Sequence, residues 1–231
     1  MTHVIAYSRQ QCKHLVSRLN KRMDADFVGI SSKAGLVAND LKKIDPGIIF
    51  FPHWSNIIPA EIYRDYECII FHMTDLPYGR GGSPLQNLIV RGHKETMISA
   101  LRCVEELDAG PIYIKKPLSL SGSANEIFSR SDALIEDMIV EILKSNPEPI
   151  PQNGEPIVFK RRKPEEGDWS KARTLSEVYD YIRMLDAEGY PPAYIHSGGY
   201  KLEFKKATKY SNSITAKVEI TKKDYNEKIK V

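Results

Sequence analysis

The sequence predicts an α/β fold of the Rossmann-like type, a doubly wound and mainly parallel sheet, with a small C-terminal α+β appendage. Two observations lead to this prediction. Over the first 75 residues, short β-branched and aromatic runs alternate with segments of helical periodicity, as in βαβ units. The run at 47–51 is apolar throughout, as expected of a parallel strand that helices cover on both faces.

The individual elements follow from local pattern. Strands are predicted over 3–8, 26–30, 47–51 and 67–72, with helices over 9–23, 37–44 and 59–66 between them. A loop is predicted over 76–83, because this stretch holds a proline and three glycines. Beyond it we expect a helix over 84–90, strands over 95–104 and 111–116, and a long amphipathic helix over 123–144.

The stretch 146–156 contains four prolines and is predicted to be a linker. We therefore expect a catalytic domain over 1–150 and a small α+β region over 151–231. In that second region the patterns predict a strand over 157–161, a helix over 175–185, and half-buried strands over 199–207 and 213–220.

Composition excludes several classes of protein. The 231 residues are 42% hydrophobic and 27% charged, the balance of an ordinary globular chain rather than a disordered or fibrous one. No apolar run approaches the roughly 20 residues of a membrane span, and the first residues lack the pattern of a secretory signal. A cytoplasmic protein without a membrane partner is expected.

The three cysteines, Cys12, Cys68 and Cys103, lack CxxC spacing. They form neither a disulfide framework nor a zinc site by their pattern, so we expect them to be small core residues and expect no metal.

Positive charge is concentrated near the C-terminus. Residues 201–231 hold nine lysines and four acidic residues. The lysines alternate with strand residues, which favours a solvated sheet face. A surface for a phosphate-bearing partner such as RNA is the alternative.

Candidate catalytic residues stand at the ends of predicted strands. His72 follows the apolar run 68–71, and Asp108 lies in a tight turn at 107–110 before the next strand. An aspartate that orients a histidine and stabilises its charged form is a recurring pair in acid–base catalysis. The two residues are therefore predicted to meet over one pocket.

The segment around His72 resembles a known family. Residues 72–86 read HMTDLPYGRGGSPLQ, similar to the motifs N-x-H-x-S-L-L-P and R-G-x-x-P-x-Q of the 10-formyltetrahydrofolate-dependent formyltransferases. Leu107-Asp108-Ala109-Gly110 resembles the L-D-x-G turn that carries the family's catalytic aspartate. The 36 positions between His72 and Asp108 fit the family without a gap. The resemblance covers about residues 45 to 120, and the family includes methionyl-tRNA formyltransferases and sugar N-formyltransferases.

The resemblance implies an N-formyltransferase that uses 10-formyltetrahydrofolate. It assigns His72 and Asp108 to catalysis. The residues that it assigns to binding of the formyl donor are Leu76, Pro77, Val104, Glu105, Glu106 and Leu107. The residues that we expect to bind the acceptor are Tyr78, Arg80 and Gly81.

The expected acceptor is the amine of an amino sugar, either nucleotide-linked or an acidic sugar of a surface polysaccharide. The C-terminal pattern is closer to sugar formyltransferases, and about 75 residues are few for a full tRNA-binding barrel. Two alternatives stay open: methionyl-tRNA as the acceptor, and a non-catalytic folate-binding relative. A nucleic-acid partner is thus not expected, but not excluded.

One position departs from the family. Ile70 stands where the family has the asparagine that helps to hold the oxyanion, and loss of one such donor costs about a hundredfold to a thousandfold in rate. Asn56 is predicted to replace it as a catalytic donor, since it follows the neighbouring strand of a parallel sheet; His53 is the other candidate. One of the two is predicted within about 5 Å of His72, a distance that a water can bridge.

Overall fold

The computed structural model describes residues 1–222 and confirms the α/β class. The lysine-rich stretch predicted above lies partly outside the described residues. The first elements are β1 (Thr2–Ala6), η1 (Gln10–Cys12), α1 (Lys13–Arg22), β2 (Asp26–Ile30), η2 (Lys33–Gly35), α2 (Ala38–Ile44), β3 (Ile48–Pro52), α3 (Ala60–Asp65), β4 (Glu67–His72) and β5 (Tyr78–Gly81). The later ones are α4 (Pro84–Val90), β6 (Glu95–Arg102), β7 (Ile112–Ser119), α5 (Ala124–Ser145), β8 (Ile157–Phe159), η3 (Pro164–Gly167), α6 (Leu175–Leu185), β9 (Ala193–Ser197), β10 (Tyr200–Lys209) and β11 (Ile214–Lys222).

Two compact units share the chain. Unit 1 comprises Met1–Pro84, Glu95–Ser119 and Phe128–Lys160, and unit 2 comprises Leu85–Lys94, Leu120–Ile127 and the chain from Arg161. The boundary expected between residues 150 and 151 falls inside unit 1.

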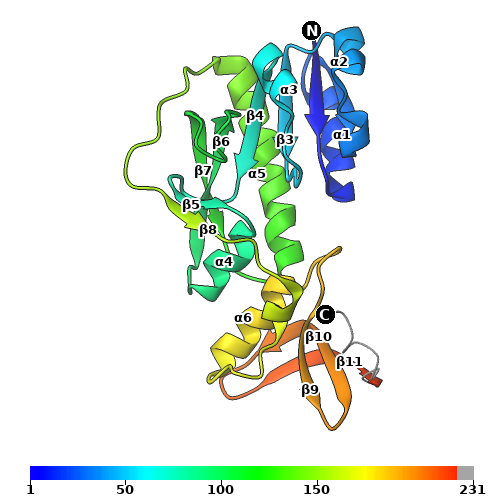
Figure 1. Ribbon diagram of the computed structural model, residues 1–231, viewed down its shortest axis with the longest axis vertical. Helices are drawn as coiled ribbons and strands as arrows, with labels where there is room; N and C mark the ends of the chain where they lie inside the picture. The colour runs from blue at the N-terminus through cyan, green and yellow to red at the C-terminus, as the bar shows by residue number, and fades with distance from the viewer. Residues whose placement is uncertain (223–231) are drawn as a thin grey trace, which may run out of the picture. The chain divides into compact units, whose positions relative to one another are not determined.

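Unit 1 is built on a six-stranded sheet of order β2-β1-β3-β4-β6-β7 (Figure 1). The first four strands are parallel, whereas β6 is antiparallel to β4 and β7 is antiparallel to β6. The chain runs from β1 outward to β2 and then returns to β3 on the other side of β1. This reversal is a topological switch point, where open α/β sheets bind ligands beyond the carboxyl ends of their strands.

Apolar strands and helix faces form the core of unit 1. Ile5, Phe50, Phe51 and Ile69 in the central strands are fully buried. On one side, a cluster of buried residues joins Ile49 and Cys68 to α2 and α3, through Leu41 and Ile62. All three cysteines are free and buried, which confirms them as core residues.

Two segments of unit 1 are more ordered than the sequence predicted. The expected loop over 76–83 contains β5, which pairs in parallel with β8. Glycine makes this close pairing possible: a Cβ on Gly81, whose φ is +98°, would lie 2.5 Å from the carbonyl oxygen of Phe159. The expected linker over 146–156 exchanges two backbone hydrogen bonds with β7, between Ile150 and Ile112. The prediction of a loop over 76–83 is therefore wrong for Tyr78–Gly81, because local composition contains no signal for a distant pairing partner.

Unit 2 joins α6 to an antiparallel sheet of order β11-β10-β9. Helix α6 starts at Thr174, whose side chain accepts a hydrogen bond from Glu177 N–H, and buries Ile182 and Met184. Strand β9 was not predicted. Most of β10 and β11 is half-buried or exposed, in agreement with the alternating pattern of the sequence.

No helix in residues 1–222 has the length and apolar character that a membrane crossing needs.

Candidate active site

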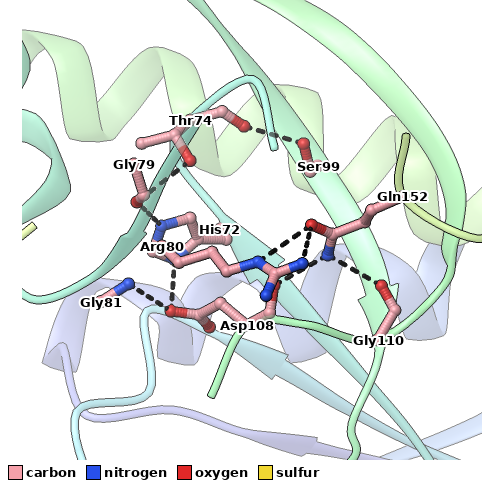
Figure 2. A network of polar contacts seen from close by, with 9 residues as sticks. All are labelled: His72, Thr74, Gly79, Arg80, Gly81, Ser99, Asp108, Gly110 and Gln152. Carbon is pink, nitrogen blue, oxygen red and sulfur yellow. Dashed lines mark hydrogen bonds and ion pairs between the residues drawn. The ribbon is translucent and has the colours of Figure 1, made fainter. Parts of the chain in front are cut away.

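His72 and Asp108 come together in unit 1, as the sequence predicted. His72 is the last residue of β4, and Asp108 lies in the connection between β6 and β7. The His72 Nδ1 atom is 3.6 Å from Asp108 Oδ2, and both side chains are more than nine-tenths buried. Figure 2 shows the two side chains facing each other. A distance of 3.6 Å is beyond a good hydrogen bond but within ion-pair range.

The other side of the His72 ring faces a carbonyl. Its Nε2 atom lies 2.8 Å from the oxygen of Gly79, to which the hydroxyl of Thr74 also donates, at 3.4 Å. Both ring nitrogens thus face oxygens that can only accept hydrogen bonds. The ring can serve both of them as a donor only when it carries a proton on each nitrogen.

Asp108 is fixed by backbone as well as by side-chain contacts. Gly81 N–H donates to Asp108 Oδ2 at 2.8 Å, and Asp108 itself has a left-handed φ of +54°. Aspartate is among the few non-glycine residues that tolerate this conformation. The left-handed conformation of Asp108 in this tight turn therefore directs its carboxylate toward His72.

Gln152 links the site to the stretch after α5. Its Nε2 donates to the carbonyl oxygens of Asp108 and Gly110, at 2.8 and 2.9 Å. Its Oε1 accepts from Arg80, at 3.1 Å from Nε and 2.9 Å from Nη2 (Figure 2). Sequence reasoning missed Gln152, because a glutamine in a proline-rich stretch carries no motif.

A second missed contact supports the segment after His72. Ser99 is the register partner of His72 across β4 and β6, and its hydroxyl donates to the carbonyl of Thr74 at 2.8 Å. Both Ser99 and Thr74 are fully buried. The periodicity of β6 placed Ser99 in a strand, but only the pairing with β4 reveals its partner.

The predicted acceptor residues have distinct surroundings. Besides Gln152, Arg80 pairs with Glu106, with Nη1 2.9 Å from Oε1. Gly81 holds Asp108 as described, and the ring of Tyr78 packs edge-on against Phe159. These contacts link Gly81 directly, and Arg80 through Gln152, to Asp108; the role of all three residues toward an acceptor stays a prediction.

The predicted donor residues lie in two connections, β4–β5 and β6–β7. Leu76 is buried, and Pro77 follows it through a cis peptide bond. Residues 104–107 lie between β6 and β7, where the ladder is interrupted; Glu105 and Glu106 are exposed, and Leu107 is 56% exposed. An exposed leucine next to Asp108, beside backbone outside the ladder, fits a flat heterocycle that needs both apolar and hydrogen-bonding contacts.

Ile70, at the position of the family asparagine, packs against the apolar cluster of α2 and α3. Asn56 lies exposed in the loop after β3, while His53 pairs with Asp132, its Nε2 3.0 Å from Oδ1. The proximity of Asn56 or His53 to His72 stays a prediction.

The geometry agrees with comparisons to known proteins. Residues 12–127 match the family described as formyl transferase. The chain belongs to the formyl transferase family. Residues 164–221 also match the C-terminal domain described for methionyl-tRNA formyltransferase, so the family assignment extends to unit 2.

Several relatives share this fold. A structure titled methionyl-tRNA formyltransferase from Clostridium thermocellum is 46% identical, with a TM-score of 0.93, and the match covers 96% of this chain and 99% of that one. A methionyl-tRNA formyltransferase of Bacillus thuringiensis is 33% identical over 68% of this chain and 52% of its own length. The chain thus spans about half the length of the curated relatives it matches. A sugar N-formyltransferase from a Shewanella species is 16% identical with a TM-score of 0.69, covering 92% of this chain and 99% of its own; this likeness shows the fold alone.

Proposed function

We propose that the protein transfers a formyl group from 10-formyltetrahydrofolate to a primary amine. The observation that carries the proposal is the buried pair of His72 and Asp108, 3.6 Å apart at the end of β4. Family membership supplies the class of reaction. The exposed connection at 104–107, next to Asp108, supports a donor site on this side of the pair.

The bound folate supplies the formyl carbon, and the residues of the chain supply protons and position. The imidazole of His72 is placed at the reacting carbon, where it acts as a base or as a donor to the formyl oxygen. Asp108 keeps that ring oriented and takes the proton of the attacking amine, directly or through a water. With Ile70 unable to donate, His72, Asn56 and His53 remain the candidate side-chain donors to the oxyanion.

Methionyl-tRNA is the acceptor that the comparisons support. The match of unit 2 to a methionyl-tRNA formyltransferase C-terminal domain, and the 46% identity to a structure of that title, both favour it. Unit 2 also holds a cavity of about 260 Å³ whose lining carries positive charge from Lys94 and Lys209, while Arg183 there is paired with Asp180. Such charge suits a phosphate backbone.

An amino sugar is the second candidate acceptor. It is favoured by unit 1 itself, where Arg9 follows β1, His53 follows β3, and both offer polar groups to a small charged substrate. Such an acceptor would need no extended cationic surface.

A direct assay separates the candidates. Purified protein with 10-formyltetrahydrofolate is supplied in turn with methionyl-tRNA, with nucleotide-linked amino sugars, and with buffer, and products are identified by mass spectrometry. Formylated methionine on tRNA, or a formamide on the sugar, identifies the acceptor, and His72→Ala is the inactive control. Tight folate binding without transfer to any amine would instead support the non-catalytic alternative.

A further inference from the structure

A group of side chains, none of them in the proposed catalytic pair, gathers at the switch point of the unit 1 sheet. Its members come from the segment after β1, the segment after β3, and helix α5. We call it the switch-point cluster: Arg9, Cys12, His53, Phe128 and Asp132. The two loops are joined next to it, since Ser55 N–H donates to the hydroxyl of Ser8 at 3.0 Å.

Arg9 is a cation without a counter-charge in this cluster. Its guanidinium lies over the ring of Phe128, with Cζ 3.9 Å from the ring centroid. No carboxylate within residues 1–222 forms an ion pair with it, and its Nε is buried without a hydrogen-bond acceptor. A partly buried guanidinium normally has a carboxylate or phosphate as its partner, since desolvation of an unpaired charge is costly.

The carboxylate of the cluster is already engaged. Asp132 Oδ1 lies 3.0 Å from His53 Nε2, and the Cys12 thiol points at the same oxygen from 3.8 Å. The His53 side chain is 6% exposed and its ring meets that of Phe128 edge-on, at 5.2 Å. The Asp132 contact therefore fixes His53 beside Arg9 and leaves Nδ1 as the ring atom available to a ligand.

A metal ion explains this cluster less well than an anion. The ligand atoms of Cys12, His53 and Asp132 do lie within 4.8 Å of one another. However, burial raises the pKa of the Cys12 thiol to about 12, which disfavours the thiolate that a metal ligand must be. The adjacent Arg9 would also repel a cation. Arg9 is the charged member of the cluster that has no ion-pair partner within residues 1–222, whereas Asp132 faces His53.

We propose that the switch-point cluster binds an oxyanion of the acceptor substrate, a phosphate or a carboxylate, with Arg9 as the main contact. The inference rests on the proposed formyl transfer and names the class of acceptor: an amine that also carries an anionic group. Arg9 pairs with the oxyanion, and His53, held by Asp132, contacts it from the side. The anion supplies the charge partner that Arg9 lacks.

The sheet sets the distance from this anion to the reacting amine. Strand β1 precedes Arg9, β4 ends in His72, and β3 lies between them. Neighbouring strands are about 4.8 Å apart, so two steps place the anion about 10 Å from the transfer centre. This span fits an amine and an anionic group at opposite ends of one sugar-sized substrate unit.

The first experiment measures anion binding without any folate or amine. Inorganic pyrophosphate and glucuronate are titrated by calorimetry into the wild-type protein, Arg9→Gln and Arg64→Gln. Arg64 is an exposed arginine in α3 and serves as the matched control for loss of one charge. We expect the wild-type protein and Arg64→Gln to bind one of the two anions with the same affinity. Arg9→Gln should bind that anion at least tenfold more weakly. Preference for pyrophosphate indicates a phosphate-bearing acceptor, and preference for glucuronate indicates an acidic sugar.

Two outcomes would overturn the proposal: neither anion binds the wild-type protein, or Arg9→Gln binds as the wild type does. Arg9→Lys, which keeps the charge, should retain part of the affinity, and circular dichroism verifies that each variant is folded. Because this titration needs no turnover, it tests the site even if formyl transfer itself is not observed.

The second experiment uses turnover once an acceptor is known. We expect Arg9→Gln to raise KM for that acceptor at least tenfold while kcat and the KM for 10-formyltetrahydrofolate stay near wild type. This split marks lost ground-state binding. An unchanged acceptor KM, with formyl transfer intact, would refute the anion site and leave the proposed function standing.

Discussion

The two units differ in where their polar side chains lie. In unit 1 the central strands are apolar and buried, and several of the polar side chains inside, His72, Ser99 and Asp108 among them, gather around one site. In unit 2 the strands β10 and β11 carry lysines and acidic residues and are largely open to solvent. The comparison teaches that the chemistry is placed where packing fixes geometry, while the exposed sheet is left for contacts that tolerate motion.

Each unit contains buried charged side chains, but the two units differ in how completely those charges are hydrogen-bonded and ion-paired. Arg183 in unit 2 is 4% exposed and fully engaged: Nε lies 2.6 Å from Asp180, and Nη1 donates to the carbonyls of Leu120 and Gly122. The pair of His72 and Asp108 is looser, at 3.6 Å. A charged side chain whose hydrogen-bonding groups are all engaged stabilises the fold. A loosely paired one retains hydrogen-bonding capacity for a substrate.

The largest expected effect tests this contrast directly. His72→Ala and Asp108→Ala should each lower formyl transfer at least about a thousandfold with melting temperatures near wild type. Arg183→Met should have the opposite effect: it should lower the stability of unit 2 by several kcal/mol, because Asp180 loses its buried partner, without a comparable loss of catalysis. Thermal unfolding and initial rates measure both. Near-normal turnover in both site variants would show that the pair is not catalytic.

A second prediction concerns the thiols of unit 1. Burial raises the pKa of Cys12 to about 12 and that of Cys103 to about 11, and it raises the pKa of Cys68 as well. At pH 8 about one Cys103 in a thousand is then thiolate, against about a quarter in an unfolded chain. We expect a disulfide reagent to label the native thiols at least about a hundredfold more slowly than the unfolded ones, with rates rising about tenfold per pH unit. Fast labelling of the native protein at pH 8 would contradict the packing of this core.

The third prediction tests Gln152 as a positioning residue. Gln152→Ala removes two donors to the Asp108 turn and the acceptor of Arg80, so kcat should fall about tenfold. Gln152→Glu keeps the acceptor and should keep the Arg80 contact while losing the donors to the turn. Gln10→Ala, at an exposed position in η1, is the control. A positioning role predicts that kcat falls more than KM rises; equal losses in stability and rate would indicate a merely structural role.

The sequence predicted the fold of unit 1 well, because its strands and helices are read from local periodicity. β2 and β4 were predicted with their observed bounds, since each is a short run rich in β-branched or aromatic residues. β5 and β9 were missed. β5 is four residues rich in glycine, and its pairing with β8 depends on a partner 76 or more positions away.

The site was predicted in part for the same reason. His72 and Asp108 lie in motifs whose spacing is visible in the chain. Gln152 and the switch-point cluster are assembled from segments about 40 to 120 positions apart, through contacts such as His53 with Asp132 and Cys12 with Asp132. No local pattern marks a residue whose role depends on distant partners.

The smallest expected effect concerns the exposed sheet of unit 2, where like charges face each other. Lys205 is in register with Lys217, and directly opposed like charges destabilise a strand pair. Lys217→Glu should therefore raise the melting temperature by about 2 °C at low salt, and the gain should vanish at high salt. Lys222→Glu, opposite Tyr200, is the control that changes the same charge without a like-charged partner.

The same substitution sharpens the choice of acceptor. If unit 2 meets the phosphates of methionyl-tRNA, Lys217→Glu should weaken transfer to tRNA and reduce its salt dependence, even though the fold becomes more stable. If the acceptor is a small amino sugar bound by unit 1, the variant should turn over at the wild-type rate. Since the stabilising and the binding effects have opposite signs, a loss of activity cannot be attributed to unfolding. An unchanged tRNA reaction would mean that this lysine pair lies outside any RNA-binding surface.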